Sequence, residues 1–130
     1  MNVRRFVILP IKISRAHQIV AIDTSISANI ISCSGILADV KGHLQTGRDI
    51  QHIGEVSILF NSGRVHPLHH SVGYHDKPLQ KCDRFMQIQE RIFTGSKVCG
   101  FYQDAGTATD EKGIFLPYQV NIYLECKAKK

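Results

Sequence analysis

Hydrophobic and polar residues alternate most regularly near the C-terminal end of the chain, from Tyr118 to Cys126. Apolar residues stand at every second position, and the positions between them hold polar residues and a tyrosine. Successive side chains of a β-strand point to opposite faces, so this period of two predicts a strand with one buried face. We expect Val120, Ile122 and Leu124 to lie in the core and the residues between them to face solvent.

Other stretches of the chain also predict β-structure. Residues 55–60 form an apolar run that ends at an Asn-Ser-Gly turn signal. Residues 85–92 and 98–102, with a Thr-Gly turn at 94–95 between them, predict a hairpin, and residues 104–113 predict a loop. No stretch shows sustained helical spacing. We therefore predict an all-β fold, an antiparallel β-sandwich of the jelly-roll or Greek-key type.

The length of 130 residues is typical of a single domain. We expect the sandwich over residues 33–126, a lead segment over 1–32 and a basic tail over 127–130. Two interpretations of the lead segment stay open: a degenerate export signal, because Arg4-Arg5 precedes a short apolar run, or extra strands. No segment reaches the roughly 18 to 20 apolar residues of a membrane helix, so we expect no transmembrane span.

Four cysteines, Cys33, Cys82, Cys99 and Cys126, are spread along the chain without a C-x-x-C pair. An even number at wide spacing favours two disulfides over a metal site, and disulfides persist in oxidising compartments. We therefore expect a secreted, extracellular protein whose sandwich is stabilised by disulfides. Four cysteines allow three pairings, and reduced thiols in a cytosolic protein are the alternative.

The formal net charge of +5 and a pI near 9.2 favour an acidic partner. The positive residues are scattered singly, except for Arg4-Arg5 and the cluster Lys127, Lys129 and Lys130. Without a longer basic run we expect no specific nucleic-acid binding. The expected partner is an extracellular protein or an acidic glycan.

Histidines gather in one segment, at His66, His69, His70 and His75, with Asp76 next to the last of them. Imidazole and carboxylate groups are zinc ligands, so these five residues are the candidate metal ligands of the chain. Their spacing enforces no site, and we expect a mobile, solvent-facing loop over residues 66–76. No cofactor is predicted, with zinc and calcium as the two ions to consider.

No catalytic motif is present: the sequence lacks a G-x-S-x-G elbow, a P-loop and a G-x-G-x-x-G turn. This pattern favours a non-enzymatic function without deciding the matter. The predicted function is a secreted or surface-displayed binding module, and the alternative is a small His-rich metal-binding or enzymatic β-domain.

The segment Cys82-Asp83-Arg84-Phe85 to Cys99-Gly100 resembles the second half of a CUB domain. In that family a cysteine leads into an acidic-aromatic-aliphatic strand and a Cys-Gly pair closes the next one. The stretch beginning Cys33-Ser34-Gly35 is similar to the opening of the same family. The resemblance implies a secreted β-sandwich with a Cys82–Cys99 bond, leaving Cys33 to pair with Cys126. Arg84 stands where many CUB domains carry a calcium-ligating aspartate.

A second set of segments, at residues 40–44, 56–60, 109–115 and 118–123, resembles the strand order of transthyretin-like extracellular domains. Both families are secreted β-sandwiches. The cysteine pairing also stays open on local grounds, because a tight turn at residues 94–95 would favour Cys33 with Cys82 and Cys99 with Cys126.

Overall fold

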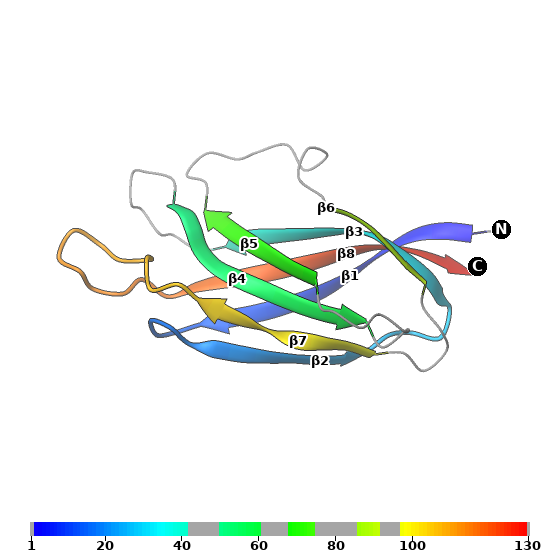
Figure 1. Ribbon diagram of the computed structural model, residues 1–130, viewed down its shortest axis with the longest axis horizontal. Coiled ribbons are helices and arrows are strands. Elements are labelled where there is room, and N and C mark those ends of the chain that lie inside the picture. The colour runs from blue at the N-terminus through cyan, green and yellow to red at the C-terminus, as the bar shows by residue number, and fades with distance from the viewer. Residues whose placement is uncertain (1, 42–49, 61–67, 75–85, 92–96, 130) are drawn as a thin grey trace.

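The computed structural model describes residues 2–41, 50–60, 68–74, 86–91 and 97–129. These residues form eight β-strands, which are shown in Figure 1. In chain order they are β1 (Asn2–Ile13), β2 (Ile19–Ser25), β3 (Ile30–Lys41), β4 (Ile50–Phe60), β5 (Leu68–Tyr74), β6 (Met86–Arg91), β7 (Lys97–Asp104) and β8 (Tyr118–Lys129). The described ranges contain no helix that is long and apolar enough to cross a membrane.

The strands form two four-stranded antiparallel sheets that pack face to face (Figure 1). Sheet A has the order β1-β8-β3-β6, and sheet B has the order β2-β7-β4-β5. The pairing is nested, because the first strand lies beside the eighth, the second beside the seventh, the third beside the sixth and the fourth beside the fifth. This is the strand order of a jelly roll, so the predicted all-β sandwich is confirmed.

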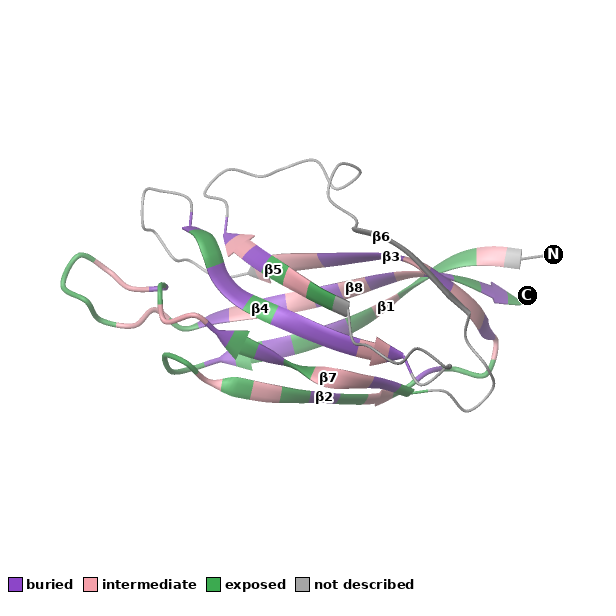
Figure 2. Ribbon diagram, viewed as in Figure 1, coloured by how far each residue is buried: buried purple, intermediate pink, exposed green. Residues whose placement is uncertain are grey.

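The core lies between the sheets, and β8 shows how the sequence pattern builds it (Figure 2). Val120, Ile122 and Leu124 are fully buried, and the residues between them are half-exposed. The predicted orientation of this strand is therefore confirmed. β8 lies between β1 and β3 in sheet A, and every second one of its residues is buried along its whole length.

The predicted hairpin over residues 85–102 is wrong. Its first half, β6, pairs with β3 in sheet A, and its second half, β7, pairs with β2 and β4 in sheet B. Local patterning predicted the strands but not their partners, because a jelly roll sends most consecutive strands, including β6 and β7, to opposite sheets and pairs strands far apart in the sequence.

The segments on either side of the expected sandwich belong to it. Residues 2–32 form β1, β2 and the beginning of β3, and they supply Leu9, Ile11, Ile13 and Ile22 to the core. The expected basic tail is the end of β8, where Lys127 pairs in register with Arg4. The domain therefore extends beyond the predicted limits at both ends.

We expect the substitution Ile122→Ala to lower the free energy of unfolding by about 2 to 5 kcal/mol, because it leaves a cavity between the sheets. Chemical denaturation at neutral pH measures this loss. Ile114→Ala is the matched control, since Ile114 is 60% exposed and its truncation should change stability by less than about 0.5 kcal/mol. Equal effects of the two substitutions would contradict the assignment of Ile122 to the core.

Candidate functional site

The described cysteines lie in two different environments. Cys33 on β3 and Cys126 on β8 face each other in register and are both buried. Their thiols are in hydrogen-bond contact, which lowers the pKa of Cys126 against the opposing effect of burial. Cys99 is half-buried on β7, in the other sheet, and Cys82 lies outside the described residues.

These positions bear on the pairing without deciding it. The three described cysteines are free thiols in the structure. Cys99 pairs in register with Asp23 and Leu59 of sheet B, and its thiol lies 3.9 Å from the Asp23 carboxylate. Cys126 lies inside the sandwich on sheet A, so the local alternative of a Cys99–Cys126 bond does not fit the fold.

The predicted loop over residues 66–76 is wrong for its described part, because residues 68–74 form strand β5. Neighbouring residues of a strand point to opposite faces, and His69 is exposed whereas His70 is half-buried. Burial lowers the pKa of His70. His66, His75 and Asp76 lie outside the described residues. Among the residues that are described, no three His, Cys, Asp or Glu side chains gather in a way that could hold a metal ion.

The exposed histidines on the outer face of sheet B make pairwise contacts. Nδ1 of His69 lies 3.6 Å from a carboxylate oxygen of Glu55, and Nδ1 of His52 lies 2.8 Å from the Ser71 hydroxyl. All four side chains are exposed to solvent. An exposed pair of this kind contributes little binding energy by itself.

Four exposed cations gather where β1 begins and β8 ends, and we call Arg4, Arg5, Lys127 and Lys129 the basic end. Arg4 lies opposite Lys127 in the antiparallel pair, and both chain termini lie at this end of the sandwich (Figure 1). The Arg4 guanidinium lies 3.2 Å from the Glu125 carboxylate and 4.8 Å from the centre of the Phe6 ring. The fold thus brings together charges that stand at opposite ends of the sequence.

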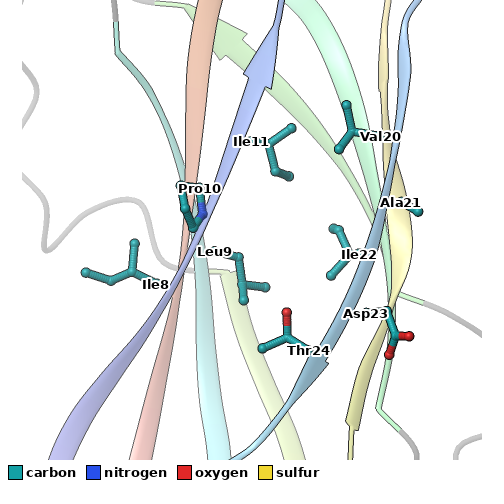
Figure 3. Close-up of a pocket in the computed structure, with 9 residues that line it drawn as sticks. All are labelled: Ile8, Leu9, Pro10, Ile11, Val20, Ala21, Ile22, Asp23 and Thr24. Carbon is teal, nitrogen blue, oxygen red and sulfur yellow. The ribbon is translucent and has the colours of Figure 1, made fainter.

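An apolar opening lies beside the basic end, between the edge strands of the two sheets. It is a cavity of about 340 Å³ lined by residues 8–11 of β1 and 20–24 of β2, and we call it the edge cavity. Figure 3 shows Leu9 and Ile11 of β1 facing Val20 and Ile22 of β2 across the opening. Sequence reasoning missed this feature, because it depends on two consecutive strands that enter different sheets.

A buried carboxylate, that of Asp104, joins several parts of the chain at the other end of the sandwich. One of its oxygens accepts hydrogen bonds from the backbone N–H groups of His17, at 2.9 Å, and Gly106, at 2.8 Å. Its other oxygen accepts a hydrogen bond from the Tyr118 hydroxyl. Burying a carboxylate is strongly unfavourable unless donors surround it, so these three bonds stabilise Asp104 at 1% exposure.

Two tyrosines extend this network into the core. The Tyr102 and Tyr118 hydroxyl oxygens lie 2.9 Å apart. Burial raises the pKa of both tyrosines, and the hydrogen bond to Asp104 raises that of Tyr118 further. A Cβ atom at Gly54 would lie 2.0 Å from the Tyr102 hydroxyl oxygen, so glycine at this position leaves room for the ring. Because the polar groups of the network bond to one another inside the core, we interpret it as a structural anchor.

Comparison with known proteins found no significant similarity. The chain matches no protein-family model, and no curated protein or solved structure is significantly similar to it. The likeness to CUB and transthyretin-like domains therefore stays a prediction from the sequence.

The anchor predicts a pH-dependent effect of the substitution Tyr118→Phe. At pH 7 we expect a loss of about 1 to 3 kcal/mol in the free energy of unfolding, because Asp104 loses one of its donors. The folded-state pKa of Tyr118 lies above the unfolded value of about 10, so this tyrosine stabilises the fold below pH 10 and loses that contribution as the pH rises further.

The stability difference between wild type and Tyr118→Phe should therefore shrink by about 1.4 kcal/mol per pH unit above pH 10. Urea titrations at pH 7, 10 and 11 measure it. Tyr123→Phe, on the half-exposed face of the same strand, is the control and should lower stability less at pH 7. A difference for Tyr118→Phe that stays constant with pH would contradict the buried network.

Proposed function

We propose that the protein is a secreted or surface-displayed binding module that recognises an acidic partner, a protein or a glycan, through the basic end. The pairing of β1 with β8 carries this proposal, because it sets Arg4 opposite Lys127 and places Lys129 on the same face, whereas Arg5 points to the opposite face at the same end. Among the described side chains of this cluster, Glu125 is the acidic one, and it pairs with Arg4.

The arrangement of these cations suits a partner with several negative charges. Neighbouring strands lie about 4.8 Å apart, so the side chains of paired residues present their charges side by side. Cations fixed on strands at one end of a sandwich create a local positive potential that attracts sulfate or carboxylate groups and speeds their association. Binding of this kind releases counterions and weakens as salt is added.

Apolar side chains lie next to the cations. They favour a partner that also offers apolar surface, a protein or a glycan with apolar faces, over one that offers charge alone. Phe6 and Ile8 follow Arg4 on the outer face of β1 and are 44% and 53% exposed. The register sets Phe6 beside Glu125 and Ile8 beside Tyr123. The basic end therefore continues into a mixed surface of the kind that protein interfaces use.

We also propose that the protein works in an oxidising compartment and that Cys33 and Cys126 form a disulfide there. The support is their position, since the two buried cysteines lie opposite each other in register on adjacent strands, at a backbone separation that disulfides can span. Thiol–disulfide exchange with an oxidised dithiol partner removes one hydrogen from each thiol and reduces the partner to two thiols. The second bond, between Cys82 and Cys99, rests on the CUB resemblance.

Chromatography on immobilised heparin tests the binding proposal. We expect retention at low salt that falls steeply between about 50 and 200 mM salt. The double substitution Lys127→Gln with Lys129→Gln should lower the dependence of log affinity on log salt by about 1 for each cation removed. Passage of the wild type through the column at low salt would contradict the proposal.

The matched control removes the same charge from the opposite end of the sandwich. Arg15 and Lys112 are exposed cations in the connections that precede β2 and β8. We expect Arg15→Gln with Lys112→Gln to elute close to the wild type. Equal losses for both pairs would mean that net charge, and not the basic end, determines retention.

Peptide mapping without reduction tests the disulfide. After refolding in a glutathione redox buffer we expect a linked peptide containing Cys33 and Cys126. Closing the loop of residues 34–125 should raise stability by about 4 to 5 kcal/mol over the reduced protein, in the chain-entropy account. Cys99→Ser should retain this gain and Cys126→Ala should abolish it. A bond from Cys33 to another cysteine would overturn the assignment.

A further inference from the structure

The edge cavity lies between two free strand edges. β1 and β2 are consecutive in the chain but enter different sheets, where β1 has β8 as its neighbour and β2 has β7. Each is the outermost strand of its sheet on the same side of the sandwich. An outermost strand leaves every second pair of its backbone N–H and C=O groups without a strand partner, which makes it a template for an added strand, although Pro10 of β1 has no N–H to donate.

Most of the side chains that line the space between these edges are apolar, and Asp23 and Thr24 add polar groups. Leu9 and Ile11 reach into it from β1, and Val20 and Ile22 reach into it from β2 (Figure 3). A volume of about 340 Å³ falls within the range of ligand-binding clefts, and it is large enough for several aliphatic side chains. Its walls therefore fit alternate apolar residues of an extended chain.

Charges flank the apolar part of β1 on both sides. Arg4 and Arg5 precede residues 6–11, and Lys12 follows them, with all three cations exposed. The carboxylate on the β2 side, Asp23, lies 3.8 Å from the Lys97 ammonium group. The rim of the edge cavity is therefore positive along β1 at both ends of its apolar stretch.

We propose that the edge cavity binds an extended segment of a partner protein, apolar in its centre and acidic at both ends, as an added strand along β1. This inference rests on the proposed recognition of an acidic partner, and it specifies which kind of segment of that partner is bound. Arg4 and Lys12 lie on the same face of β1 and stand eight positions apart, which is about 26 Å in a strand. The acidic residues of the partner segment should have a similar separation.

The same charges disfavour a second copy of the chain at this edge. Two β1 strands paired antiparallel would bring Arg4 and Arg5 of one copy toward Lys12 of the other, and like charges on opposite strands are destabilising. Charged residues on an edge strand are a common protection against self-association. An acidic segment converts this repulsion into attraction, so charge complementarity selects it over a second copy.

The binding test uses a fluorescein-labelled peptide with two glutamates at each end of a central stretch of alternating valine and threonine. We expect binding by fluorescence anisotropy that weakens with salt. A peptide in which lysines replace the four glutamates should bind at least about tenfold more weakly. Equal binding of the two peptides would overturn the charge argument.

Substitutions on β2 separate the edge cavity from the basic end. Val20→Trp fills the cavity from the β2 side and should weaken peptide binding about tenfold or more, with heparin retention unchanged. Ile19→Trp is the matched control, because Ile19 lies on the same strand, is 61% exposed and does not line the edge cavity. Thermal unfolding confirms that both variants are folded, and if Val20→Trp is not, the shorter Val20→Phe replaces it.

Each outcome decides between the alternatives. Heparin retention without peptide binding would leave the proposed function standing and overturn this inference, and loss of both would overturn both. Unchanged peptide binding by Val20→Trp would place the peptide elsewhere.

Two further measurements test other occupants of the edge cavity. Displacement of the peptide by decanoate as effectively as by unlabelled peptide would indicate a small apolar ligand. A dimer in sedimentation that dissociates on peptide addition would indicate a second copy of the chain. Either result would overturn the proposed occupant.

Discussion

The hydrogen bonds of the buried Asp104 carboxylate are the interaction on which the arrangement of the two sheets depends. Asp104 ends β7 of sheet B, and its partner Tyr118 begins β8 of sheet A. His17, from the connection between β1 and β2, donates to the same carboxylate. Sheet A and sheet B are thus joined at one end by polar contacts, whereas apolar packing joins them elsewhere. Since a buried carboxylate requires its donors in place, this junction specifies how the sheets are set against each other.

Local sequence patterns are sufficient to predict a strand and its orientation where the strand has one buried face. The alternation in β8 predicts both its existence and its orientation, because a period of two is a property of the strand alone. The partners of each strand do not follow from that pattern. β6 and β7 are separated by five residues and look like a hairpin, yet they pair into different sheets. The sheet that each strand joins depends on pairing between residues far apart in the sequence. The local pattern of one sequence does not predict such pairing.

The basic end and the anchor could not be predicted from the sequence, for related reasons. Lys127 and Lys129 look like a tail until pairing places them beside Arg4 and Asn2, since the charges meet only through the register of β1 and β8. Asp104 looks like the start of a polar loop. Its Asp-Ala-Gly sequence does carry a local signal, because aspartate often bonds the backbone two residues on, as it does here to Gly106. Burial of that aspartate arises only when the two sheets close over it.

The nested strand order also determines how the molecule responds to a pulling force. Asn2 and Lys129 are paired neighbours at the same end of sheet A. Tension applied between them loads the β1–β8 ladder from one end, so its hydrogen bonds break in succession and not all at once, which is the mechanically weak direction of an antiparallel pair. A bond between Cys126 and Cys33 would tie β8 to the central strand β3 three residues from its end. Separation of β8 from β3 would then stop almost where it starts, and β1 alone would peel away.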